Sequence, residues 1–281
     1  MTVDCPICGN DNVRLGLQLD RLGKRWDIYG CNHCRTEFVC PVPPNKELKS
    51  LYSERYRTFS EEWARLMNPN YGRLSFPRQW GIIKSLVKEK QGRILDFGCG
   101  GGHFLDRVSD NWDKYGVEIS VIGREVAKTK GIKVYAHLSS LRNYEGAFDV
   151  IVMFATIEHL PNPREVVSQL RRLLKAGGLF VVMTGDVASV KAKVQGKHWH
   201  LYTPPGHLHF FSAYTVDYLM RLLGFEKIKH LYTDGGVTRV PFMPLNLALR
   251  AGLEIYHRLP VLNRLPLLDT YYGYYRKAGV L

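Results

Sequence analysis

The residues best suited to chemistry begin with an acidic side chain followed by alternate glycines, namely Asp96, Gly98, Gly100 and Gly102. A glycine turn after a buried strand lets a ligand approach the backbone, because no Cβ stands in the way. A dinucleotide-binding fingerprint would place its third glycine at position 103, where this chain has His103. The pattern therefore predicts a nucleotide-like ligand other than NAD.

Two cysteine pairs form a second chemical group, Cys5 with Cys8 and Cys31 with Cys34. Two C-x-x-C pairs that a β-hairpin can bring together offer four thiolates to one tetrahedral metal ion. In a reducing compartment this set favours structural zinc over a disulfide, and a redox centre would need only one pair. The sequence therefore predicts an N-terminal zinc ribbon.

The glycine turn resembles motif I of the class I S-adenosylmethionine (SAM) dependent methyltransferases. The resemblance implies that the turn lies under the methionine part of SAM and that Asp96 bonds it. Glu118 ends the next apolar run, where a carboxylate can accept hydrogen bonds from both ribose hydroxyls. A fourth buried strand is expected at 150–154, and residues 155–160 after it resemble the family's motif after strand four. Since open parallel sheets bind ligands beyond the carboxyl ends of their strands, we expect Phe154 and Ala155 to face the cofactor.

The resemblance covers roughly residues 90 to 235 and implies an α/β fold. We expect a Rossmann-like, seven-stranded, mostly parallel sheet with helices on both faces. An amphipathic helix should follow the glycine turn from Phe104 onward, and a seventh, antiparallel strand should begin near Val237. The predicted domains are a zinc ribbon at 1–44, a helical cap or linker at 45–92, the SAM-binding core at 93–240 and a basic amphipathic extension at 241–281.

A histidine-rich loop follows the fifth predicted strand, and four of the ten histidines lie between His198 and His209. The loop's Trp and its His-Leu-x-Phe-Phe-Ser pattern resemble small-molecule methyltransferases that include the ubiquinone-pathway O-methyltransferases. Methyl transfer needs an aligned nucleophile and, for a hydroxyl or amine, a group that removes a proton. Histidine suits that removal near neutral pH, so His207 and His209 are the first catalytic candidates. Helix capping or backbone hydrogen bonding is the structural alternative.

A metal-assisted interpretation uses Glu158 and His159, which follow the fourth predicted strand and make His159 a further catalytic candidate. The ubiquinone-pathway enzymes and the small-RNA 3′-end 2′-O-methyltransferases carry Glu-x-x-Glu-His at this place. The RNA enzymes supply a further histidine downstream, which corresponds here to His207 or His209. In this chain Ala155 replaces the first glutamate. The remaining set suits Mg²⁺ poorly, because Mg²⁺ prefers oxygen ligands.

The net charge of +13 is spread along the chain, without a Lys/Arg run that would follow a phosphate backbone. We therefore expect SAM-dependent methyl transfer to an oxygen, nitrogen or carbon of a small molecule, which could be anionic, or of a nucleotide- or lipid-linked intermediate. An RNA methyltransferase is the alternative. An inactive SAM-fold binding protein is a third interpretation, which the intact acidic and glycine motifs disfavour.

The chain has no apolar run long enough to span a membrane, and its first residues lack a signal-peptide pattern, which predicts a cytoplasmic protein. The basic, leucine-rich extension at 241–281 could lie against an acidic membrane face, or pack on its own domain or on a second subunit. These alternatives leave the oligomeric state open.

Overall fold

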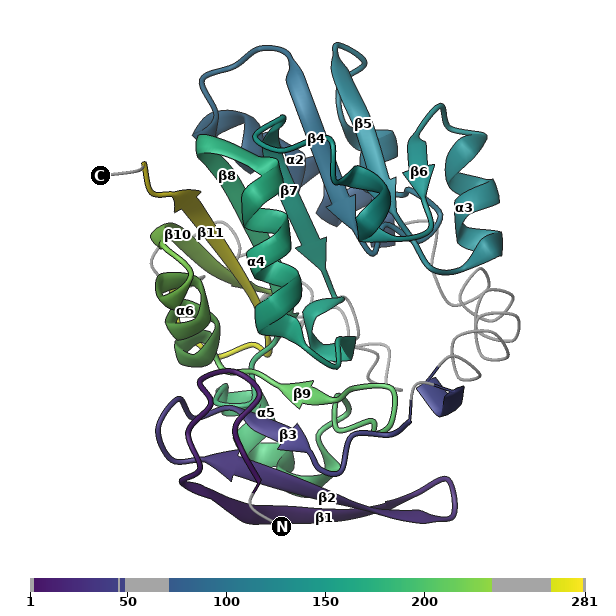
Figure 1. Ribbon diagram of the computed structural model, residues 1–281. Coiled ribbons are helices and arrows are strands. Elements are labelled where there is room, and N and C mark those ends of the chain that lie inside the picture. The colour runs from purple at the N-terminus through teal and green to yellow at the C-terminus, as the bar shows by residue number, and fades with distance from the viewer. Residues whose placement is uncertain (1–2, 45, 49–70, 234–263, 280–281) are drawn as a thin grey trace, which may run out of the picture.

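The computed structural model describes residues 3–44, 46–48, 71–233 and 264–279, and its core is a seven-stranded sheet (Figure 1). The strand order is β10-β11-β8-β7-β4-β5-β6, with β11 antiparallel to both of its neighbours. The strands are β4 (Gly92–Phe97), β5 (Trp112–Val117), β6 (Lys133–Tyr135), β7 (Phe148–Phe154), β8 (Leu174–Gly185), β10 (Phe225–Thr233) and β11 (Thr270–Lys277). This topology confirms the predicted Rossmann-like α/β fold.

The central strands are buried on both faces. β4 and β7 pair in parallel, with Ile94 opposite Val150 and Asp96 opposite Val152. Ile94, Val150 and Val152 are fully buried. Strands covered on both sides are continuous apolar runs in the sequence, and such runs predict the positions of β4 and β7.

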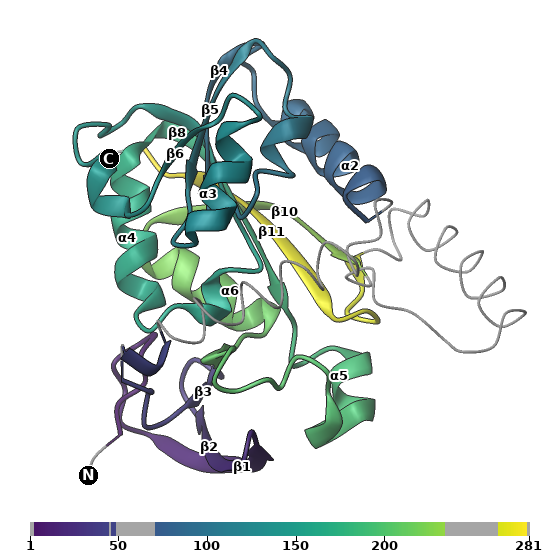
Figure 2. The same ribbon diagram turned by 90° about the vertical axis from the view of Figure 1, so that its right-hand side faces the viewer.

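Helices cover both faces of the sheet. Figure 2 shows α2 on one side and α4 with α6 on the other. The helices are α2 (Tyr71–Leu86), α3 (Val121–Lys128), α4 (Pro163–Leu173), α5 (Val190–Gln195) and α6 (Ala213–Leu222). The Ser212 hydroxyl caps α6 by accepting a hydrogen bond from the Thr215 N–H. Among these helices of the described segments, none has the length and apolarity that crossing a bilayer requires.

Two predicted elements differ from the structure. The prediction of an amphipathic helix after the glycine turn is wrong. The chain makes only one 3₁₀ turn there, Leu105–Arg107, before β5 begins at Trp112. The predicted start of the seventh strand near Val237 lies outside the described residues. The antiparallel strand that is described, β11, comes instead from the range assigned to the C-terminal extension. Residues 241–263 of that extension also lie outside the described part of the chain.

β11 lies inside the sheet because its tyrosines bury apolar rings on both faces. The side chains of Tyr271, Tyr272, Tyr274 and Tyr275 are all buried. A buried phenol needs a hydrogen-bond partner, and the hydroxyls of Tyr271 and Tyr275 donate to Asp217 Oδ1 at 2.9 and 2.6 Å. This tyrosine-rich part of the predicted extension therefore packs on its own domain, as part of the core.

The N-terminal region forms a second sheet with four strands in the order β1-β2-β3-β9. These strands are β1 (Val13–Arg21), β2 (Lys24–Cys31), β3 (Glu37–Val39) and β9 (His209–Phe210). Since β9 belongs to the histidine-rich loop, the ribbon and the SAM-binding core share one sheet. Figure 1 shows this sheet below the carboxyl ends of β4 and β7. The ribbon therefore approaches the edge at which open α/β sheets bind their ligands.

Candidate functional site

The glycine turn lies at the carboxyl end of β4, where its backbone requires glycine. Gly98, Gly100 and Gly102 have φ angles of +83°, +52° and +72°, in the region that side chains rarely adopt. A Cβ on Gly98 would lie 2.3 Å from Thr156 Oγ1, and one on Gly102 would lie 2.3 Å from Ile132 Cδ1. The glycines therefore allow both the path of the turn and its close packing on neighbouring elements.

Asp96 is a buried acid at the base of this turn. It is 3% exposed, and among the described residues its Oδ1 has no hydrogen-bond partner. Burial, and after it the charge of Glu118, raise the pKa of Asp96 to about 8. A buried carboxyl group without a partner is costly, and a cation beside it would favour its charged form. The site therefore fits SAM, whose amino acid part carries an ammonium cation.

Glu118 ties the end of β5 to the glycine turn. Its Oε2 accepts a hydrogen bond from the Gly100 N–H at 2.9 Å, and its Oε1 accepts one from the Ser120 N–H at 2.7 Å. Each carboxylate oxygen can accept a second donor, such as a ribose hydroxyl. The structure thus brings Asp96, the glycines and Glu118 together at one edge of the sheet.

Phe154 and Ala155 lie at the end of β7, beside the turn. Ala155 has a φ of +47°, and its N–H donates to the Met183 carbonyl at 2.9 Å. The ring of Phe154 packs against Phe104 of the turn and Phe76 of α2, with centroid distances of 4.9 and 6.4 Å. The helical segment predicted as a cap therefore contributes an aromatic contact at this edge.

We expect the affinity for SAM to rise with pH until about pH 8, the pKa of Asp96. Below that pH the free protein carries a neutral Asp96, whereas a bound cation favours the carboxylate, so binding must release a proton. The dissociation constant should fall by up to about tenfold per pH unit, measured by titration calorimetry from about pH 6 upward. Asp96→Asn, which mimics the neutral acid, should lose this slope, and an unchanged slope in that variant would contradict the assignment.

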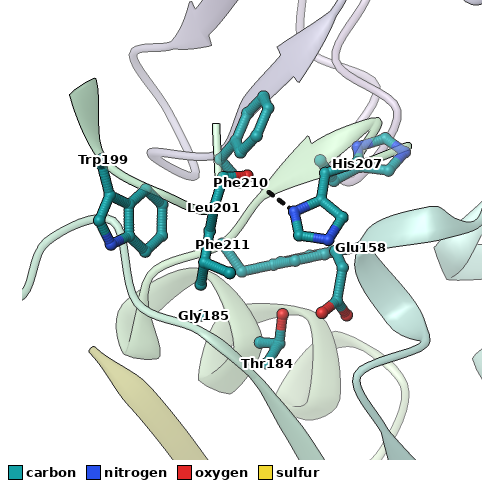
Figure 3. A pocket seen from close by; sticks show the side chains of 9 residues that line it. Glu158, Thr184, Gly185, Trp199, Leu201, His207, Phe210 and Phe211 are labelled. Carbon is teal, nitrogen blue, oxygen red and sulfur yellow. Dashed lines mark hydrogen bonds between the residues drawn. The ribbon is translucent and has the colours of Figure 1, made fainter. Parts of the chain in front are cut away.

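His159 and His207 face each other, with ring centroids 4.7 Å apart. His159 Nδ1 lies 2.6 Å from the Gly206 carbonyl. His207 Nδ1 lies 2.7 Å from the Leu201 carbonyl, a contact that is drawn in Figure 3. A carbonyl only accepts, so the Nδ1 atom of each ring carries a proton. The backbone therefore fixes the orientation of both rings.

Glu158 completes this group. One ligand atom from each of Glu158, His159 and His207 lies within 4.8 Å of the other two. Burial raises the pKa of Glu158, and among the described residues its Oε2 has no hydrogen-bond partner. Figure 3 shows its carboxyl group beside Thr184, and both residues line a cavity of about 10 Å³ with His207. That volume accommodates about one water molecule.

The chemistry of His207 follows from its surroundings. Burial, followed by the neighbouring His159, lowers the pKa of His207 to about 3. The ring is therefore neutral at physiological pH, and it is a good hydrogen-bond acceptor and metal ligand but a weak base. The three side chains of Glu158, His159 and His207 suit holding a hydroxyl group or a divalent cation better than unaided proton removal.

His209 lines the same small cavity as Glu158 and His207, but it also belongs to the joint between the ribbon and the core. It forms part of β9, pairs with Phe38 of the ribbon and is 1% exposed. Burial lowers the pKa of His209 to about 4, and within the described segments neither ring nitrogen has a partner in good hydrogen-bond geometry. The structure therefore places His209 inside the joint between the ribbon and the core, away from solvent.

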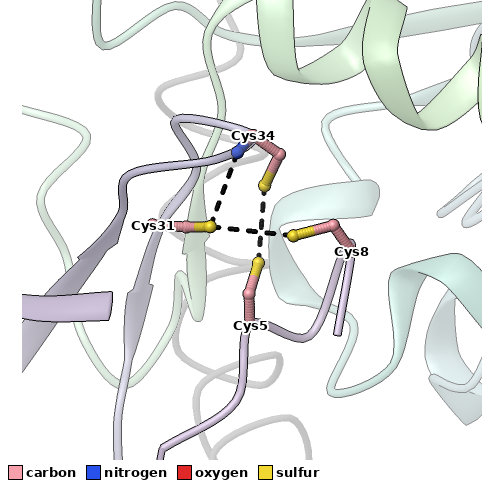
Figure 4. A group of neighbouring side chains, drawn as sticks. All are labelled: Cys5, Cys8, Cys31 and Cys34. Carbon is pink, nitrogen blue, oxygen red and sulfur yellow. Dashed lines mark hydrogen bonds between the residues drawn. The ribbon is translucent and has the colours of Figure 1, made fainter. Parts of the chain in front are cut away.

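The four predicted zinc ligands converge in the ribbon (Figure 4). The Cys5 and Cys34 sulfurs are 3.4 Å apart, and the Cys8 and Cys31 sulfurs are 3.7 Å apart. A tetrahedral site with Zn–S bonds of about 2.3 Å has sulfur–sulfur edges of roughly 3.8 Å. The arrangement fits a closed structural zinc site, which remains a prediction.

The electrostatics of the four thiols also favour a cation. The hydrogen bond with Cys34 lowers the pKa of Cys5 to about 5, and the same bond raises the pKa of Cys34 well above its usual value. Burial raises the pKa of Cys8 to about 11. Four adjacent thiolates repel one another unless a cation offsets their charge, which Zn²⁺ would supply.

We expect elemental analysis to find about one zinc per chain and Cys5→Ser to release it. Since β9 extends the ribbon sheet, zinc loss should make both the ribbon and residues 201–211 sensitive to proteases. Cys40→Ser is the matched control, because Cys40 lies outside the cysteine cluster, and it should keep both zinc and protection. A zinc-free protein with an unchanged digestion pattern would show that the metal has no structural role.

Sequence reasoning missed the residues that anchor the histidine-rich loop. Trp199 Nε1 and Lys191 Nζ donate to the carboxylate of Asp269, at 2.8 and 3.1 Å, and the Tyr202 hydroxyl donates to Glu37 Oε2 at 2.6 Å. The partners are separated by 70 or more residues. No local spacing indicates such pairs, and only the aromatic content of the loop suggested a role beyond connection.

Comparisons with known sequences show the family of the chain. A family model described as a methyltransferase domain matches residues 40–230. The ubiquinone biosynthesis O-methyltransferase of Caulobacter sp. (strain K31) is 27% identical over 207 residues, which cover 62% of this chain and 79% of that protein.

Solved structures show the same fold. A SAM-dependent methyltransferase from Thermotoga maritima matches with a TM-score of 0.55 at 22% identity, over 81% of this chain and 99% of that one. A structure of the Haloferax volcanii Trm112 methyltransferase activator with a methyltransferase matches with a TM-score of 0.58 at 12% identity, over 81% and 98% of the two chains. The family match and the sheet topology together establish that this chain belongs to the methyltransferase-domain family and is a SAM-dependent methyltransferase of class I fold.

Proposed function

We propose that this enzyme transfers the methyl group of SAM to an oxygen of a small hydroxylated molecule. The observation that carries the proposal is the facing pair His159 and His207, each of which places a ring nitrogen within 4.8 Å of a Glu158 carboxylate oxygen. Such a group can hold an acceptor hydroxyl by hydrogen bonds. The similarity to a ubiquinone biosynthesis O-methyltransferase supports oxygen as the acceptor atom.

The connection after β7 brings cofactor and acceptor together. Phe154 and Ala155 lie beside the glycine turn, and Glu158 and His159 follow in the 3₁₀ turn Ile157–His159. In-line methyl transfer needs the nucleophile, the methyl carbon and the sulfur in one row, which a short rigid connection can maintain. On this proposal Asp96 and Glu118 hold SAM, and His207 holds the acceptor. His209 has a packing role, because it is buried in the ribbon joint.

The same three side chains fit a divalent cation. Each histidine has its Nδ1 fixed by a backbone carbonyl, and metal-binding histidines are usually oriented by such a contact from the nitrogen that does not bind the metal. Two imidazoles with one carboxylate favour Mn²⁺, Co²⁺ or Zn²⁺ over Mg²⁺. A cation bound there would lower the pKa of the acceptor hydroxyl, which would compensate for the weak basicity of His207.

We expect Mn²⁺ to bind to the purified protein and to raise its methyltransferase activity. His207→Ala should weaken Mn²⁺ binding by roughly ten- to a hundredfold, the usual effect of disturbing a ligand set, as measured by titration calorimetry. The matched control is His137→Ala, which removes an exposed histidine outside this group. Equal Mn²⁺ affinity in both variants would exclude the cation and leave hydroxyl binding as the role of these residues.

The acceptor class can be tested with SAM that carries a labelled methyl group. We expect label in small phenols and catechols, detected by mass spectrometry, and turnover that depends weakly on salt. RNA would instead bind with an affinity that falls steeply with salt, with a slope of about −0.7 per phosphate contact for single strands. Label in RNA with that salt dependence, and none in small hydroxylated molecules, would favour an RNA methyltransferase.

A further inference from the structure

We infer that the ribbon positions His159 and His207, the two histidines of the proposed acceptor site. Glu37 and Tyr202 form the side-chain contact through which it does so. Glu37 belongs to β3 of the ribbon, and Tyr202 belongs to the loop that carries His207. The inference rests on the proposed function in one respect, namely that His207 lies at the acceptor site.

Leu208 makes the backbone part of this connection. Its carbonyl accepts a hydrogen bond from the Val39 N–H at 2.9 Å, and its own N–H donates to the Glu158 carbonyl at 2.8 Å. One fully buried residue therefore joins the ribbon strand to the turn that carries Glu158 and His159. Buried backbone groups are costly to leave unpaired, so displacement of β3 would disturb that turn.

Glu37 and Tyr202 hold the chain that precedes His207, whereas Leu208 holds the chain that follows it. The Tyr202 hydroxyl donates to Glu37 Oε2 at 2.6 Å, and the Tyr202 ring packs on Phe210 with a centroid distance of 4.7 Å. The neighbouring Leu201 carbonyl is the group that accepts from His207 Nδ1. Glu37 and Val39, two residues apart on β3, therefore hold the chain both before and after His207.

The cysteine cluster sets the position of β3. The Cys31 N–H donates to the Thr36 carbonyl at 2.9 Å, which closes the knuckle directly before Glu37. The Cys34 carbonyl accepts from Thr215 Oγ1 at 3.1 Å, in the first turn of α6. The knuckle that contains Cys31 and Cys34 is thus hydrogen-bonded to the core on one side and is continuous with β3 on the other. Zinc binding should therefore affect the position of His207, although the cysteines do not lie at the acceptor site.

The test measures the accessibility of His207 without needing the acceptor. Diethyl pyrocarbonate modifies accessible neutral histidines, and mass spectrometry gives the rate at His207 relative to the exposed His137. We expect Tyr202→Phe, with zinc retained, to raise this relative rate by about fivefold, the usual effect of losing one hydrogen bond. Tyr144→Phe removes a tyrosine–tyrosine hydrogen bond away from the ribbon and should change nothing.

Zinc removal should raise the relative rate further, while the affinity for S-adenosylhomocysteine stays at the wild-type value. If zinc removal also abolishes the affinity for S-adenosylhomocysteine, the core has unfolded. The zinc-loaded Tyr202→Phe variant then tests the inference by itself. An unchanged His207 rate in Tyr202→Phe would overturn the inference. That outcome is distinguishable from failure of the proposed function, which would appear as full methyltransferase activity in His207→Ala.

Discussion

Replacing His207 with alanine should reduce the turnover number by roughly 10²-fold or more, while the affinity for SAM stays nearly unchanged. The neutral ring of His207 presents an unprotonated Nε2, and among the described residues no other His, Cys, Asp or Glu side chain joins its group with Glu158 and His159. The loss would remove a contact to the reacting hydroxyl, or to a cation that activates it. Steady-state kinetics with the labelled methyl group, together with calorimetry for SAM, separate the two quantities.

Two further histidine variants sharpen this result. His207→Asn keeps a donor for the Leu201 carbonyl but lacks the Nε2 lone pair, so it should lose activity as alanine does. His198→Ala removes an exposed ring at the start of the same loop and should retain most activity. If His207→Asn and His207→Ala both turned over at the wild-type rate, the acceptor would have to bind elsewhere.

Glu118→Ala should weaken SAM binding by roughly ten- to a hundredfold, because a charge-assisted bidentate contact is worth roughly 1.5 to 3 kcal/mol. The variant would also lose the hydrogen bond that the Gly100 N–H donates to the carboxylate, and with it a support of the glycine turn. Calorimetry with SAM measures the loss, and thermal unfolding without ligand shows whether the fold survives.

The matched control for this prediction is Glu125→Ala. Glu125 is an exposed residue of α3, paired only with Lys128 on the same helix among the described contacts, so its removal should leave SAM binding unchanged. Equal affinities in Glu118→Ala and Glu125→Ala would remove Glu118 from the cofactor site.

The parts of the fold that the sequence predicted are those with a local signal. β4 and β7 are short apolar runs, and the glycine turn joins a strand to a tight loop within a few residues. The three motif glycines have the positive φ angles that only glycine adopts easily. The cysteine spacing is local in each knuckle, and the four sulfurs do converge.

The parts that could not be predicted depend on pairing between distant segments. β11 enters the sheet between β10 and β8 from the far end of the chain, and β9 joins the ribbon through Glu37 opposite Phe210. A two-residue strand has no periodicity of its own, so the burial of His209 was invisible in the sequence. The prediction of a helix after the glycine turn was wrong for a related reason. The apolar spacing is helical, but the segment between the turn and β5 is short and forms only one 3₁₀ turn.

The most direct test of the whole account is a crystal structure of the protein with S-adenosylhomocysteine. The account predicts the adenosine beside Glu118 and the amino acid part over the glycine turn near Asp96. It also predicts that the sulfur faces Glu158, His159 and His207 across the space left for a methyl group. A ligand bound with its sulfur directed away from these three residues, or separated from them by the protein, would contradict the account.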